Sequence, residues 1–198
     1  SIAIGSIAAL RQDNIKRLFA YGTIANIGYV LVGVISNSEL GLSSAILYLL
    51  IYTIASLGIF SFIMMLRKEN TQILNLQGLS GFSQSNSLAA ICMIILLLSM
   101  AGIPPFAGFF AKLYIFISAV ETNFLFLAII GVIFSVISAF YYLKIIKIMY
   151  MDNSDDNSSF ELDNRMLLFL IFISISMFLF IFFANDFINF INNLNIRI

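Results

Sequence analysis

The chain has 198 residues, of which 61% are hydrophobic and 10% are charged, and its formal net charge is zero. Soluble domains usually contain about 45–50% apolar and about 25% charged residues. This composition therefore excludes a soluble domain and indicates a polytopic membrane protein. A neutral chain also gives no electrostatic footprint for nucleic acid.

Several kinds of site are excluded by residue type. Histidine is absent and Cys92 is the only cysteine, so the chain offers neither an internal disulfide nor a zinc site. There is no GxGxxG or other glycine-rich phosphate loop. We therefore expect no metal or cofactor in this chain.

Hydropathy predicts an all-α bundle of transmembrane helices. A membrane-crossing helix needs about 20 apolar residues, so the first ten or so residues are too short to cross and read as the tail of a helix. The expected elements are a helix tail at 1–11, spans at 14–35, 42–66, 88–120, 124–150 and 165–184, and a short helix in the membrane interface at 185–198.

The segment 88–120 is expected to be broken at 103–106. Pro104 and Pro105 lack N–H groups, and Gly102 and Gly108 flank them. Freed backbone groups in lipid cost several kcal/mol unless other groups or water satisfy them. Transporters use such breaks to hold ions or protons near the membrane midplane.

Lys112 follows this break within an apolar run. Because burial disfavours the charged ammonium, a lysine there could accept and release protons. The alternative is a lysine whose ammonium reaches the membrane interface. The break favours the proton-transfer interpretation.

Charge is distributed unevenly between the two ends of the expected spans. If successive spans cross the membrane in alternating directions, eight cations lie at or near one face of the membrane. They are Arg11, Lys16, Arg17, Arg67, Lys68, Lys144, Lys147 and Arg165. The opposite face receives Glu39, Glu121, Asp186 and the single cation Arg197. The positive-inside rule assigns the basic face to the cytoplasm or matrix and the C-terminus to the outer side.

Other residues are weaker candidates for a proton path. Tyr48, Tyr52 and Ser56 recur every four residues and could order water along a proton path, although hydroxyls more often join helices. Lys16 could belong to that path or could serve only as a positive-inside anchor. Lys144 and Lys147 follow Tyr141 and Tyr142, a pattern that favours an aromatic belt at the interface.

Three runs carry a resemblance to a known family. They are ALRQDNIKRLFAYGTIANIGYVLVGVI at 9–35, LYLLIYTIASLGIF at 47–60 and LLSMAGIPPFAGFFAKLYIF at 97–116. In this order they resemble the C-terminal half of subunit 2 of respiratory NADH:quinone oxidoreductase (complex I), an antiporter-like membrane subunit. The resemblance implies the second of two inverted repeats with one discontinuous helix, followed by a final helix.

The resemblance implies roles and partners as well. Lys112 matches the lysine that ends the family's proton half-channel, Lys16 matches a central-axis residue of some relatives, and Asn26 stands where many relatives have histidine. NADH, FMN, iron–sulfur clusters and quinone would be bound by other subunits. Expected partners are lipid, membrane-arm subunits of the subunit 4 and subunit 4L types, and a separate chain that supplies the N-terminal half.

Heavy use of Ile, Asn and Phe suggests an organellar genome and hence the mitochondrial inner membrane, with a bacterial plasma membrane as the alternative. Two other functions stay open. The chain could belong to a multisubunit cation/proton antiporter or a membrane-bound hydrogenase, which share this fold. It could also be a structural spacer within a membrane arm.

Overall fold

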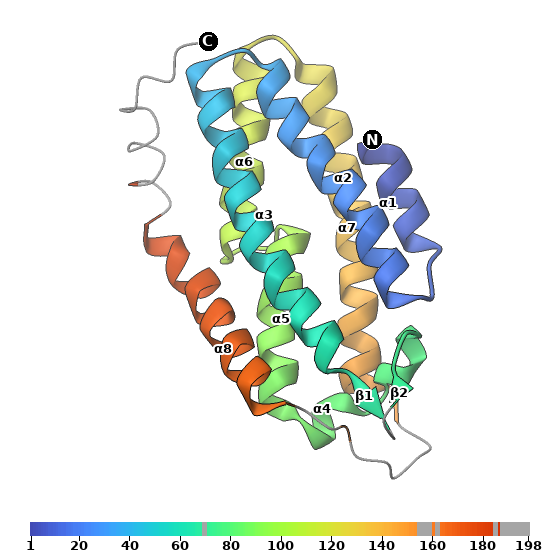
Figure 1. Cartoon of the computed structure of the whole chain (residues 1–198). Helices are drawn as coiled ribbons and strands as arrows, with labels where there is room; N and C mark the ends of the chain where they lie inside the picture. Colours follow the sequence, from blue (N-terminus) through green and yellow to red (C-terminus); the bar gives the residue numbers. More distant parts are fainter. Residues whose placement is uncertain (69–70, 154–159, 161–162, 184–185, 187–198) are drawn as a thin grey trace.

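The computed structural model describes residues 1–68, 71–153, 160, 163–183 and 186. Within this part the chain is almost entirely helical (Figure 1). The helices of the bundle are α1 (Ile2–Leu10), α2 (Ile15–Ile35), α3 (Glu39–Met65), α5 (Ser87–Ala101), α6 (Ala107–Glu121), α7 (Leu125–Met151) and α8 (Asn164–Leu179). The fold class expected from the sequence is confirmed.

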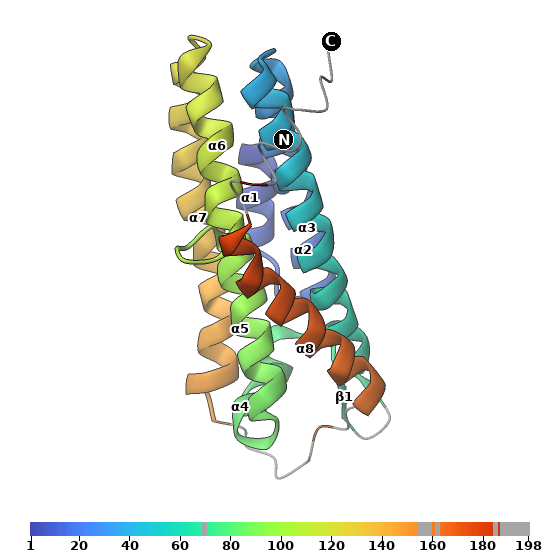
Figure 2. The ribbon, with the colours of Figure 1, turned by 90° about the vertical axis from the view of Figure 1, so that its left-hand side faces the viewer.

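Three helices, α2, α3 and α7, are each long and apolar enough to cross a membrane. Helices α5 and α6 have 15 residues each, which is shorter than the roughly 20 residues that a crossing needs. They follow one another along the bundle (Figures 1 and 2). Together they make one discontinuous helix, beside the three helices in the described part of the chain that are each long enough to cross.

Local signals set several helix ends. Asn14 and Ser38 are N-caps whose side chains accept from the backbone N–H groups of Arg17 and Gly41. Because Ser38 is a cap, α3 begins at Glu39, three residues before the expected start at 42. The final span was expected over 165–184, but α8 ends at Leu179 and the short 3₁₀ helix η2 (Phe180–Phe182) follows.

The polar loop after α3 is folded onto the start of α2. It contains two-residue antiparallel strands, β1 (Arg67–Lys68) and β2 (Thr71–Gln72), then η1 (Leu76–Leu79) and α4 (Phe82–Ser85). Ile15 N donates to Leu74 O at 2.8 Å, and Leu76 N donates to Asp13 O at 2.9 Å. The loop therefore closes one end of the bundle.

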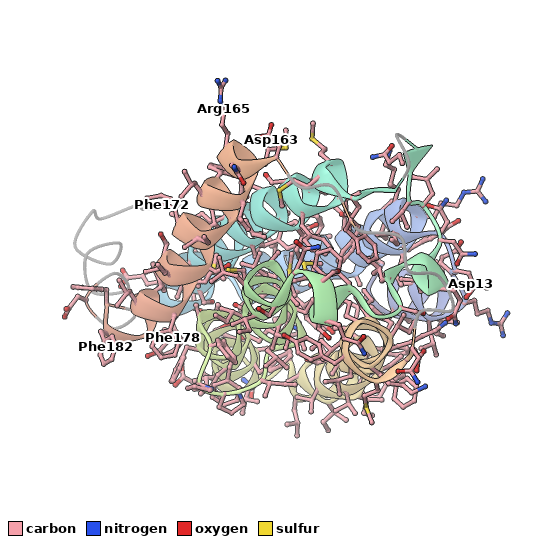
Figure 3. All side chains as sticks on the ribbon, turned by 90° about the horizontal axis from the view of Figure 1, so that it is seen from below. Asp13, Asp163, Arg165, Phe172, Phe178 and Phe182 are labelled. Carbon is pink, nitrogen blue, oxygen red and sulfur yellow. The ribbon has the colours of Figure 1, made fainter. Side chains whose placement is uncertain are left out.

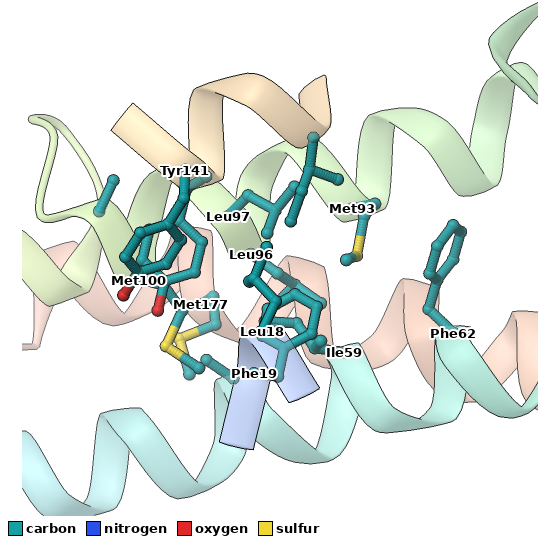
Figure 4. Packing of buried hydrophobic residues seen from close by; sticks show 14 of the residues in the cluster. Leu18, Phe19, Ile59, Phe62, Met93, Leu96, Leu97, Met100, Tyr141 and Met177 are labelled. Carbon is teal, nitrogen blue, oxygen red and sulfur yellow. The ribbon is translucent and has the colours of Figure 1, made fainter. Parts of the chain in front are cut away.

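The core lies between the helices and is assembled from segments far apart in sequence. Figure 4 shows Phe19 of α2, Ile59 of α3, Leu96 of α5, Tyr141 of α7 and Met177 of α8 gathered in one cluster. Large apolar side chains also cover the outside, as Phe126, Phe140 and Phe172 illustrate. A helix that is apolar on all sides is typical of a membrane bundle.

Charged residues gather at one end of the bundle. Figure 3, which looks along the bundle from below, shows Asp13, Asp163 and Arg165 at its rim. Lys144 Nζ lies 3.3 Å from Asp13 Oδ1, and Lys147 Nζ lies 3.2 Å from Asp152 Oδ1. The interfacial helix expected at 185–198 falls outside the described residues except for Asp186, and Arg197 lies outside them altogether.

Candidate functional site

The break between α5 and α6 is produced by its own sequence. Gly102 ends α5 in the left-handed region, with φ of 79°, a conformation that glycine adopts without steric cost. In an α-helix the N–H groups of residues 104 and 105 would bond to the carbonyls of residues 100 and 101. Both positions are proline, so the carbonyls of Met100 and Ala101 lose those donors.

Lys112 supplies the missing donor from the first half of α6. Its Nζ donates to Met100 O at 3.0 Å and to Ala101 O at 3.2 Å. A third bond goes to Ser135 Oγ of α7 at 3.3 Å. The lysine is 3% exposed, so the two half-helices and α7 meet at one buried ammonium group.

The surroundings of Lys112 are polar but uncharged. Its described partners are carbonyl and hydroxyl oxygens, and none is a carboxylate. The Nζ also lies 4.9 Å from the centre of the Tyr29 ring, a cation–π distance. Among the described residues, the groups around the Lys112 Nζ are therefore two carbonyls, a hydroxyl and an aromatic face.

The backbone at the start of α6 lies close to the backbone at the end of α5. Gly108 N donates to Ser99 Oγ at 3.1 Å. A Cβ at Gly108 would overlap the Ser99 carbonyl group. The glycine at this position therefore allows the start of α6 to lie against the end of α5.

Buried polar side chains continue away from Lys112, first through aromatic contacts and then through hydrogen bonds. The Tyr29 and Tyr48 rings meet edge to face, with centroids 6.0 Å apart. Tyr48 Oη donates to Asn26 Oδ1 at 2.7 Å, and Asn26 Nδ2 donates to Tyr142 Oη at 3.3 Å. All four of these side chains are buried, so polar groups run through the interior from the break toward the basic end of α7.

The tyrosine pair in the second half of α7 corrects one expectation. Tyr141 and Tyr142 were predicted to form an aromatic belt at the interface, but each is 1% exposed. They lie inside the bundle, where a Cβ at Gly22 of α2 would be 3.5 Å from both hydroxyls. The aromatic-belt interpretation is therefore wrong for these residues.

The other candidates are only partly brought together. Tyr48 joins the chain above, and Tyr52 Oη donates to Thr23 Oγ1 at 2.7 Å. Ser56 Oγ instead bonds within its own helix, to Thr53 O at 2.8 Å. Lys16 is exposed at the start of α2, where its Nζ donates to Gln72 Oε1 at 2.9 Å, well apart from the break.

A small cavity lies next to the break. It measures about 10 Å³ and is lined by Tyr48, Tyr52, Ser99 and Gly108 among others. A volume of roughly 10–15 Å³ holds about one water molecule when polar partners surround it. The cavity between α3 and the half-helices therefore has the size of one water molecule at most.

Sequence reasoning missed three members of the site, namely Tyr29, Ser135 and Tyr142, and it noted Asn26 only as a departure. Asn26 and Tyr142 are 116 positions apart, so no spacing within one helix could pair them. The available signal was the polar amide of Asn26 in the middle of the span predicted at 14–35.

The chain is similar in sequence to a family of membrane proteins. Residues 1–138 match the family model described as "NADH:quinone oxidoreductase/Mrp antiporter, TM". NADH-quinone oxidoreductase subunit N of Pelagibacter ubique is 39% identical over 99% of this chain and 42% of its own length. Subunit N 1 of Rhizobium meliloti is 47% identical over 77% of this chain and 32% of its own length.

Solved structures agree in fold. A chain of respiratory complex I from Thermus thermophilus has a TM-score of 0.82 at 23% identity, covering 96% of this chain and 43% of that one. A chain of the Mrp complex from Dietzia has a TM-score of 0.86 at 20% identity, covering 96% and 44%. This chain thus spans less than half the length of the proteins it matches, and it belongs to the family of transmembrane subunits shared by NADH:quinone oxidoreductase and Mrp antiporters.

Proposed function

We propose that this chain is the Lys112-bearing part of a proton-translocating subunit in the membrane arm of respiratory complex I. The observation that carries the proposal is the buried ammonium of Lys112, held by two carbonyls of a broken helix and one hydroxyl. A buried lysine exchanges protons more readily than an exposed one because desolvation disfavours its charged form. The named relatives support assignment to NADH-quinone oxidoreductase.

The proton would enter at the basic end of the bundle. From there the hydroxyls of Tyr142, Tyr48 and Tyr29, with water near Tyr52, would lead it to Lys112 and onward to the end that carries Glu121. Asn26 lies between two tyrosines, and an amide passes protons poorly, so water beside it would complete this step. Lys16 would act at the entrance, because it lies at the exposed start of α2.

The part of the relatives' sequences that this chain does not match would supply further charged groups to the proton path. We propose that this part is contributed by a separate chain or by sequence outside the 198 residues, and that the subunit corresponds to subunit 2, the counterpart of subunit N. NADH, FMN, iron–sulfur clusters and quinone would be bound by other subunits, with the subunit 4 and subunit 4L types as membrane neighbours. Residue usage favours the mitochondrial inner membrane, and the bacterial relatives favour a bacterial plasma membrane.

Substitution of Lys112 by methionine tests the proposal. Methionine keeps much of the apolar stem but has no proton to exchange, so the assembled complex should pump far fewer protons per NADH oxidised. Proton uptake and NADH oxidation are measured together in sealed vesicles. Lys147→Met is the matched control, because Lys147 is 61% exposed and should leave pumping unchanged. Normal pumping by the Lys112 variant would refute the proposal.

The fold shared with the Mrp complex favours one alternative, a cation/proton antiporter subunit. A chain of the membrane-bound sulfane sulfur reductase also has this fold, with a TM-score of 0.84. Purification of the native assembly distinguishes these functions. Flavin and iron–sulfur subunits in the assembly support complex I or a related reductase, and their absence supports the antiporter. A structural spacer would instead tolerate loss of the Lys112 ammonium without any change in transport.

A further inference from the structure

The ammonium of Lys112 occupies a set of oxygens that resembles the ligands of an alkali cation. Met100 O, Ala101 O and Ser135 Oγ surround Nζ at 3.0, 3.2 and 3.3 Å, and the face of Tyr29 covers another side at 4.9 Å. Membrane proteins bind Na⁺ and K⁺ with backbone carbonyls at helix breaks, where these oxygens replace the water shell of the ion.

The two carbonyls are available because of the proline pair. Proline at 104 and 105 removes the N–H groups that would bond to residues 100 and 101 in a continuous helix. Both carbonyls also lie at the C-terminal end of α5, which carries the negative end of the helix dipole. This end therefore attracts a cation whether or not a lysine is present.

We infer that the break is a binding site for a monovalent cation that the protein fills with its own lysine, and that Lys112 thereby keeps Na⁺ and K⁺ out of the proton path. This inference rests on the proposed function, since it explains why the path would carry protons alone. Lys112 would then have two roles, as the group that exchanges protons and as a tethered ion that occupies the site.

The chemistry of the site favours monovalent ions. Ca²⁺ and Mg²⁺ sites in proteins rely on carboxylates, whereas the three oxygens here are neutral. No group of His, Cys, Asp or Glu residues able to hold a metal ion occurs in the described part of the chain. The remaining positions around a bound ion would be filled by water in the space left by the lysine stem.

Removal of the lysine tests this inference. The complex carrying Lys112→Ala is purified and equilibrated with ²²Na⁺ or with ⁸⁶Rb⁺, a probe for K⁺. We expect saturable binding of one ion more per complex than in the wild type. Lys112→Met is the matched control, because its side chain fills the same space without charge and should bind no additional ion.

The oxygen ligands are tested in the same background. Adding Ser135→Ala to Lys112→Ala removes one ligand to a charged group and should weaken the additional binding about tenfold. Lys112→Ser provides a second variant if the alanine variant does not assemble. Ion binding equal to that of the wild type in the assembled Lys112→Ala or Lys112→Ser complex overturns the inference. Proton pumping by Lys112→Met is measured separately from ion binding. Normal pumping would therefore refute the proposed function without refuting the cation site, and a lack of additional ion binding would refute the cation site without refuting the proposed function.

Discussion

Tyr141 and Tyr142 are adjacent in the sequence and equally buried, yet their hydroxyl groups have different surroundings. Tyr142 Oη accepts a hydrogen bond from Asn26 Nδ2 at 3.3 Å. Tyr141 Oη has no hydrogen-bond partner among the described residues. A buried hydroxyl without a partner costs free energy, whereas one that is bonded contributes a modest net stabilisation.

The pair gives a matched test of the polar interior. Tyr142→Phe leaves the buried Asn26 Nδ2 without its acceptor, while Asn26 Oδ1 keeps its bond from Tyr48, and should destabilise the protein by about 1–3 kcal/mol. Tyr141→Phe removes only an unpaired hydroxyl and should be neutral or slightly stabilising. The thermal unfolding midpoint of the purified complex and the amount of assembled complex measure both effects. A Tyr141 variant that loses as much stability as the Tyr142 variant would contradict this account.

At the residue scale, sequence could predict the centre of the site but not its surroundings. A lysine seven positions beyond a proline pair within an apolar run is a local pattern, and it directed attention to Lys112 correctly as a buried residue. The Tyr48–Asn26–Tyr142 chain depends on three different helices. Tyr142 lies next to lysines near the end of α7, so its local pattern favoured the interface even though neighbouring helices cover it.

At the scale of elements, the break between α5 and α6 depends on two glycines with different roles. Gly102 provides a backbone conformation with φ of 79°, and Gly108 provides space beside Ser99. Both could be named from the sequence because glycine and proline interrupt an apolar run. Their separate roles could not be predicted from the sequence, because the role of Gly108 depends on the Ser99 backbone that it faces.

Gly108→Ala tests the close approach of the two half-helices. The added methyl group would overlap the Ser99 carbonyl, so α6 must shift away from α5, at a cost of about 1–3 kcal/mol. That shift would also weaken the bonds from Lys112 to Met100 and Ala101, so proton pumping should fall along with stability. Pumping per NADH and the thermal unfolding midpoint are measured on the same preparation.

Gly22→Ala is the control for this experiment. Gly22 is also buried within a helix, but a Cβ there meets only the Tyr141 and Tyr142 hydroxyls, at the ordinary contact distance of 3.5 Å. Alanine favours the helix over glycine by up to about 1 kcal/mol, so this variant should keep or gain stability. Equal losses at positions 22 and 108 would show that the close approach at the break has no special importance.

At the scale of the whole molecule, the distribution of charge predicts an orientation. Lys144 and Lys147 pair with Asp13 and Asp152 at one end, and Glu121 lies at the other end, where α6 stops. Hydropathy and charge alternation could predict this arrangement because they depend on the order of spans and not on side-chain packing. The inclination of α8 across α3 and α5 (Figure 2) could not be predicted, since it depends on contacts between helices.

Labelling of single cysteines tests the orientation. Cys92 is buried and is the only cysteine, so Cys92→Ala provides a background for Lys147→Cys and Glu121→Cys. By the positive-inside rule, position 147 should face the cytoplasm or matrix and position 121 the opposite compartment. A membrane-impermeant maleimide added to sealed vesicles of known orientation should therefore label the two variants from opposite sides. Labelling of both from one side would mean that α7 does not cross the membrane, and the proton path along it would have to be abandoned.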